Sequence, residues 1–240
     1  MRLTAIHLCV LLMLAATIIS PDVCAQCNDS THCQAPHSSL NSQFSILNSH
    51  FDDHAFTWQQ SIAPSALLAT GTAISFSPLH ATLDTRIHTW SQRDGHPRNE
   101  IENVIQYIPD ASVLLLKACG LESRHNWRDL ICLEAGSALL AFTTSTGMKH
   151  ALGVQRPYGN VYNSFPSGHT VTAFVGAEML RREYGKEYPG IAIAGYTVAT
   201  GVGLLRIYNN RHWASDVLAG AGVGILSVSL MYWLAPYLTF

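Results

Sequence analysis

Three short groups of residues in the second half of the chain carry side chains that can bind an anion and react with it. Six residues separate Lys149 from Arg156, and Arg206 follows further along the chain. Two guanidinium groups and an ammonium group in one pocket repel each other unless they share an anion, and their donors suit the oxygens of a phosphate. We therefore expect the three cations to form a phosphate-binding site.

The segment Pro166-Ser167-Gly168-His169 adds further donors to this site. Apolar residues follow it, so we expect it to open a helix, whose first N–H groups and positive dipole end attract an anion. Ser167 can add its hydroxyl group to the same anion. His169 can serve as a general acid that protonates a leaving oxygen.

His212 and Asp216 supply a reactive pair. They are four residues apart, so on a helix they lie one turn apart on the same face. Asp216 can accept one ring N–H of His212 and leave the other ring nitrogen unprotonated, as in an activated nucleophile. The residue types alone do not decide whether His212 or Ser167 is the nucleophile.

Helices must position these groups, because strand signals are scarce after residue 62. The expected fold class is all-α. Residues 79–104 are expected to form an amphipathic or interfacial helix followed by a loop. The other segments expected to be helical are 63–76, 105–120, 130–148, 167–184, 189–207 and 215–235.

The composition favours a membrane-embedded bundle. Charged residues make up 12% of the 240 residues, about half the soluble average. Segment 215–235 is long enough to span a bilayer, whereas 130–148 and 189–207 are borderline. Two connections rich in Lys and Arg, around 117–128 and 181–186, fit one cytoplasmic side and place the reactive loops outside. A soluble helical bundle in the periplasm is the alternative.

The N-terminus is typical of an exported protein. Residues 1–25 combine Arg2, an apolar run and Val23-Cys24-Ala25 before a cleavage point, which predicts a signal peptide or a retained anchor. Residues 26–62 form a polar exported arm, in which Cys27 and Cys33 can close a disulfide in an oxidising compartment. Residues 63–240 form the helical domain. Cys119 and Cys132 lie in apolar segments and are expected to be buried thiols.

The charge and the cysteine pattern exclude other classes. A formal net charge of −2 argues against a nucleic-acid partner, which needs a basic face. The six Cys show no spacing typical of a zinc site. We expect neither a metal nor a cofactor, and the sequence does not predict the oligomeric state.

Taken singly, each reactive group has an ordinary explanation. The three cations could be loop residues, the segment that begins at Pro166 could be a helix N-cap, and His212 and Asp216 could be a packed pair. Together and in this order they resemble the signature of the type 2 phosphatidic acid phosphatase superfamily, which includes bacterial class A acid phosphatases and vanadium haloperoxidases. That signature is Lys, six residues, Arg-Pro; then Pro-Ser-Gly-His; then Ser-Arg, five residues, His, three residues, Asp. The chain departs from it only at Leu205, where the signature has a Ser that makes a secondary phosphate contact.

The resemblance implies a six-helix core and metal-free hydrolysis of a phosphate ester. It implies that His212 attacks phosphorus and forms a phosphohistidine, that Asp216 holds the His212 ring, and that His169 protonates the leaving alkoxide. The residues that it implies for phosphate binding are Lys149, Arg156, Arg206, Ser167 and Gly168.

The leading hypothesis is a phosphatase that acts on a lipid phosphate or pyrophosphate at the periplasmic face of the cytoplasmic membrane. By resemblance, the substrate types are phosphatidate, phosphatidylglycerol phosphate, lipid A and polyprenyl pyrophosphate. The main alternative is a soluble periplasmic non-specific acid phosphatase. A haloperoxidase that holds vanadate normally has a much longer chain, and the intact His169, His212 and Asp216 argue against a non-catalytic membrane scaffold.

Overall fold

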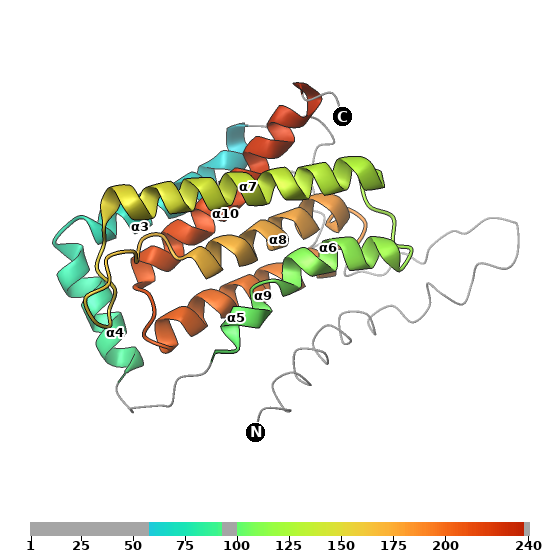
Figure 1. Ribbon diagram of the computed structural model, residues 1–240. Coiled ribbons are helices and arrows are strands. Elements are labelled where there is room, and N and C mark those ends of the chain that lie inside the picture. The colour runs from blue at the N-terminus through green and yellow to red at the C-terminus, as the bar shows by residue number, and fades with distance from the viewer. Residues whose placement is uncertain (1–57, 93–99, 238–240) are drawn as a thin grey trace, which may run out of the picture. The chain divides into compact units, whose positions relative to one another are not determined.

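The computed structural model describes residues 58–92 and 100–237, all of which belong to the compact unit His54–Phe240. All regular secondary structure in these residues is helical, which confirms the expected all-α fold (Figure 1). The expected signal peptide, Cys27, Cys33 and most of the polar arm lie outside the described residues.

The described helices follow the expected segments closely. The 3-10 helix η1 (Trp58–Ser61) leads into α3 (Ile62–Ser75). A bend separates α3 from the next two elements, the π-helix η2 (His80–Asp84) and α4 (Thr85–Ser91). The expected helix at 105–120 is instead a short α5 (Glu102–Ile105) and α6 (Ile108–Ala118), because Pro109 starts a new helix. The remaining elements are α7 (Trp127–Leu152), α8 (Gly168–Tyr184), α9 (Pro189–Tyr208), α10 (Ala214–Leu234) and η3 (Ala235–Tyr237).

Helix α8 is the centre of the bundle. Twelve of its seventeen residues are buried, and it contacts α6, α7, α9 and α10; in Figure 1 it lies between α7 and α9. Two glycines permit close packing on it. A Cβ atom on Gly176 would lie 2.2 Å from the backbone nitrogen of Asp110, and one on Gly220 would lie 2.8 Å from the carbonyl oxygen of Ser167. The starts of α6 and α8 therefore rest directly against neighbouring helix backbones.

Three helices of the described part are long and apolar enough to cross a membrane: α7, α9 and α10. A fourth span is counted if Trp58–Ser75 and His80–Ser91, which meet at 86°, are taken as one broken span. Large apolar side chains such as Leu139 and Phe142 on α7 are two-thirds exposed. Such an outer surface is costly in water and favourable in lipid.

The expectation for the cysteine thiols was wrong. Cys119 is exposed and Cys132 is half-buried. Cys119 is the residue after the end of α6, and Cys132 lies on α7 between the exposed Ile131 and the buried Leu133. An apolar segment alone does not tell which face of a helix is buried.

Candidate active site

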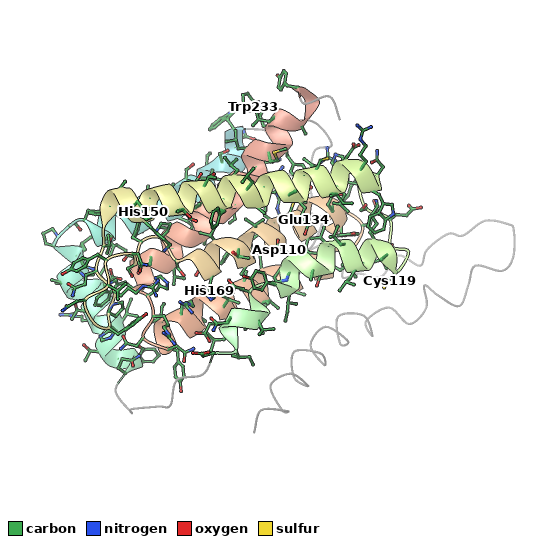
Figure 2. All side chains as sticks on the ribbon, viewed as in Figure 1. Asp110, Cys119, Glu134, His150, His169 and Trp233 are labelled. Carbon is green, nitrogen blue, oxygen red and sulfur yellow. The ribbon has the colours of Figure 1, made fainter. Side chains whose placement is uncertain are left out.

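The three groups of reactive residues meet at one end of the bundle. They come from the last turn of α7, the loop that precedes α8, the first turn of α8, the last turn of α9 and the loop that leads into α10. Figure 2 shows His150 and His169 toward this end of the bundle, whereas Cys119 lies toward the opposite end. Helix ends, rather than helix middles, therefore build the site.

His212 is held in a buried hydrogen-bond network. Its side chain is 2% exposed, and its Nδ1 lies 3.2 Å from Oδ2 of Asp216 and 3.3 Å from Oγ of Ser164. Ser164 donates its hydroxyl to the same Oδ2 at 2.5 Å, and the backbone N–H of Trp213 donates to it at 2.9 Å. A carboxylate oxygen accepts, so the contact with His212 requires the proton on Nδ1 and leaves Nε2 unprotonated.

Asp216 therefore has two tasks. It holds the ring of His212, and through the N–H of Trp213 it also satisfies a donor at the start of α10. Its backbone carbonyl accepts the N–H of Ser167 at 3.0 Å. The residue that orients the histidine is thus also fastened to the start of α8.

The first turn of α8 presents donors toward the same region. Ser167 begins the helix without capping it through its side chain; it is fully buried, and its Oγ accepts the hydroxyl of Thr170 at 2.9 Å. Ser167 can therefore donate its own hydroxyl proton elsewhere. The first N–H groups of a helix have no partner within the helix, so Gly168 and the residues after it can donate to an anion.

Lys149 and Arg156 brace the loop before α8. Lys149 Nζ donates to the carbonyl oxygens of Asn163 at 3.0 Å and Pro166 at 2.5 Å. Arg156 Nε donates to Oδ1 of Asn163 at 2.7 Å, and its guanidinium lies 5.9 Å from the ring centre of Tyr158. Both cations are therefore fixed close to the start of α8.

Arg206 is paired with an acid that the sequence did not single out. Its Nη1 lies 3.2 Å from Oε1 of Glu102, and Asn209 donates to the other oxygen of Glu102 at 2.8 Å. The side chains of Arg206 and Glu102 are 6% and 1% exposed. Arg206 Nε is buried without a hydrogen-bond partner among the described residues. One donor of Arg206 therefore stays available for a bound anion.

His169 contacts a residue from the same short helix as Glu102. Its Nε2 lies 2.8 Å from Oδ1 of Asn103. Burial, Arg206, His212 and the other two cations lower the pKa of His169 to about 3. A bound phosphate brings negative charge beside the same ring and raises that pKa again. The protonation of His169 is thereby coupled to occupation of the site.

A second carboxylate, that of Asp84 from the earlier part of the chain, holds the start of α10. Asp84 is buried and accepts the backbone N–H of Ser215 at 3.0 Å and its hydroxyl at 2.5 Å, while His80 Nδ1 lies 2.8 Å from the same carboxylate. The Trp213 side chain donates to the carbonyl of Gln155 at 2.8 Å. The element η2 thus helps to set where His212 lies.

All the sequence-predicted site residues lie at this end of the bundle, and the contacts link them to residues that sequence reasoning missed: Ser164, Glu102, Asn103 and Asp84. Among the described residues, no group of three or more His, Cys, Asp or Glu is placed to hold a metal ion. The arrangement can bind a phosphoryl group between cations and a helix start, next to a buried, oriented imidazole.

Comparisons with known proteins agree with this chemistry. Residues 130–240 match the family model described as PAP2 superfamily. The chain is similar to a lipid A 1-phosphatase of Porphyromonas gingivalis, with 44% identity over 143 residues, which are 59% of this chain and 32% of that protein. A lipid A 1-phosphatase of Helicobacter pylori is 35% identical over 102 residues, 39% of this chain and 50% of that protein.

A further relative is the bacitracin transport permease protein BcrC of Bacillus licheniformis, 37% identical over 81 residues, 32% of this chain and 36% of that protein. The matches span a third to a half of the length of these curated relatives. Among solved structures, LpxE of Aquifex aeolicus has a TM-score of 0.49 at 20% identity, covering 66% of this chain and 97% of that one. The transmembrane PAP2-type phosphatidylglycerolphosphate phosphatase of Bacillus subtilis has a TM-score of 0.48 at 22% identity, covering 74% and 98%.

Proposed function

Residues 130–240 match the PAP2 superfamily model, and from this premise we propose that the chain is a member of that superfamily and a metal-independent phosphatase of membrane lipids. It hydrolyses a lipid phosphate or pyrophosphate at the periplasmic face of the cytoplasmic membrane. The observation that carries the proposal is the buried His212, oriented by Asp216 at the end of the bundle where α8 begins.

In the proposed mechanism, Nε2 of His212 attacks phosphorus and the bond from phosphorus to the leaving oxygen breaks. His169 gives its proton to that oxygen, and the phosphoryl group stays on His212 as a phosphohistidine. Water, deprotonated by His169, then releases phosphate and restores His212. The groups that hold the phosphoryl oxygens throughout are Lys149, Arg156, Arg206, the Ser167 hydroxyl and the N–H of Gly168.

A lipid substrate is supported by two independent features. The exposed apolar sides of the long helices suit a protein that meets its substrate within a membrane. Two of the relatives are named lipid A 1-phosphatases, so a lipid A 1-phosphate is the first substrate type to test. The further substrate types to test are phosphatidate, phosphatidylglycerol phosphate and polyprenyl pyrophosphate.

The test is phosphate release by the purified protein in detergent with a chelator present. A lipid A-type 1-phosphate and a water-soluble aryl phosphate are compared, with His212→Ala as the background. We expect the lipid to be hydrolysed with a kcat/KM at least tenfold above that of the aryl ester. Equal or better turnover of the aryl ester favours the soluble acid phosphatase instead, and loss of activity with the chelator rules out the metal-independent mechanism.

The acid limb of the pH profile should report His212. Burial, with Arg206, Arg156 and Lys149 nearby, holds the pKa of His212 well below its usual 6.5. The attacking form is neutral, so kcat/KM should be lost only well below pH 6.5 as the pH falls. Removing one cation in Arg156→Gln raises that pKa, and we expect the acid limb to move to higher pH with the same substrate. If the acid limb does not move in Arg156→Gln, the assignment of that limb to His212 is wrong, whatever happens to the rate.

Asn103 should act as a positioning residue for His169. Asn103→Ala removes the acceptor 2.8 Å from Nε2, so we expect kcat to fall about tenfold with little change in KM. Asn103→Asp places a negative charge there and raises the pKa of His169, so the alkaline limb of kcat should move to higher pH. A structural role alone would lower activity in both variants without moving that limb.

A further inference from the structure

A cavity of about 310 Å³ extends away from the active site between α6, α7 and α8. Lys149, Gly168 and His169 line one end of it, and Asp110 and Val175 line the other. The residues that α8 contributes recur every three or four positions, so the cavity follows one face of this helix for two turns. Its volume lies at the lower end of the range of roughly 300–1,000 Å³ for small-molecule sites.

The cavity lies on the His169 side of the site. His169 lines it, whereas His212, Arg156 and Arg206 do not. In an in-line displacement the leaving oxygen departs on the side of phosphorus opposite the nucleophile. The cavity therefore starts where the leaving group stands when His169 protonates it.

Several polar groups in the cavity have no partner in the part of the chain that the structure describes. Thr146 and Thr172 line it, and their hydroxyls make no hydrogen bond with described residues. Tyr107 also lines it, but its side chain is 57% exposed, so its hydroxyl is not counted with these two. Thr143 and Thr197 differ, since their hydroxyls donate to carbonyls four residues earlier in their helices.

Asp110 adds a carboxyl group to this set. Its Oδ1 is buried without a hydrogen-bond partner among the described residues. Unpaired polar groups around a cavity are costly unless a bound molecule satisfies them.

We propose that this cavity binds the leaving group of the substrate and selects a leaving group that carries hydroxyl or amide groups next to the phosphate ester, as an acylated amino sugar does. The assignment rests on the proposed phosphatase function. Hydroxyl and amide groups both donate and accept, so they pair with the hydroxyls of Thr146 and Thr172 and with a neutral carboxyl group.

The charge state of Asp110 favours a neutral ligand over an amine. Burial, and to a smaller extent Glu134, raise the pKa of Asp110 to about 8, so its carboxyl group is protonated at neutral pH. Figure 2 shows Asp110 and Glu134 side by side in the bundle. A protonated carboxyl group donates a hydrogen bond to a hydroxyl or amide oxygen and offers no charge to a cation. Exposed Tyr107 and Phe142 also line the cavity, so acyl chains can leave it toward lipid.

The test compares two lipids in the same detergent: an acylated glucosamine 1-phosphate and a phosphatidate with matching acyl chains. The double variant T146V/T172V removes two hydroxyls at almost constant volume. Thr197→Val, on the exposed side of α9, is the matched control. We expect the preference of the wild type for the sugar lipid, as a ratio of kcat/KM values, to fall at least tenfold in the double variant and to stay unchanged in the control.

The outcomes separate the two proposals. If both lipids are hydrolysed and the ratio does not change in the double variant, the cavity assignment is wrong and the phosphatase function stands. If the wild type hydrolyses neither lipid above the His212→Ala background, the proposed function itself is wrong. Asp110→Leu should lower the same ratio and Asp110→Asn should keep it, because Asn also donates and accepts; equal loss in both would show a structural role.

Discussion

Replacing His212 with Ala is expected to lower phosphate release by at least about 10³-fold, because in the proposed mechanism the attacking atom is lost and the remaining cations only bind the phosphoryl group. The His212 side chain is 2% exposed and is held by Asp216. A small base from the solvent should therefore not take over the position of the lost ring. Initial rates on the lipid phosphate give the loss of activity. A rapid-quench reaction with ³²P-labelled substrate should trap an acid-labile, base-stable phosphoprotein in the wild type and none in the variant.

His150→Ala is the matched control for that experiment. His150 lies beside Lys149 at the end of α7, but its side chain is exposed, and it belongs to none of the networks around His212. We expect its activity to remain close to that of the wild type. A phosphoprotein that still forms in the His212→Ala protein would show that another residue, such as Ser167, is the nucleophile.

Replacing Glu102 with Ala should destabilise the protein by about 3–5 kcal/mol, because it leaves the guanidinium of Arg206 buried without its counter-ion. Both side chains are almost fully buried, and Asn209 loses an acceptor at the same time. The midpoint of thermal unfolding in detergent measures the effect. Inorganic phosphate should restore part of the lost stability, since a bound anion supplies charge to Arg206 and binds only the folded state.

Glu100→Gln is the matched control here. Glu100 pairs with Arg211 at 3.5 Å, but its side chain is 73% exposed, and exposed ion pairs contribute little. We expect almost no change in its unfolding midpoint. A Glu102→Ala protein that is equally destabilised with and without phosphate would argue that Arg206 does not face the bound anion.

The candidate site residues could be singled out from the sequence because each group lies within about ten positions of the chain. The expected shared helix face of His212 and Asp216 was wrong, because α10 begins at Ala214 and His212 precedes its N-cap, but the two side chains still meet at 3.2 Å across the start of that helix. The segment from Pro166 to His169 begins a helix, as the apolar run after it indicated. Local spacing carries this information, and no knowledge of the packing is needed.

Glu102, Asn103 and Asp84 could not be found in the same way. They lie in the polar stretch 79–104, between 66 and 131 residues away from the groups that they contact, and nothing in their spacing marks them. Their role depends on how α5 and η2 pack against α8, α9 and α10. From the sequence, a bound anion alone was expected to balance the charge of Arg206, whereas the fold also provides the carboxylate of Glu102.

The two tasks of Asp216 have a consequence for how related chains lose activity over time. Because this carboxylate also secures the start of α10, selection for a stable protein keeps it even where the chemistry is no longer needed. His169 has no comparable structural duty: its contact in the described part is with the exposed Asn103. In duplicated copies that drift toward a non-enzymatic role, His169 should therefore change early and Asp216 late, so an intact Asp216 is a poor marker of an active copy and an intact His169 a good one.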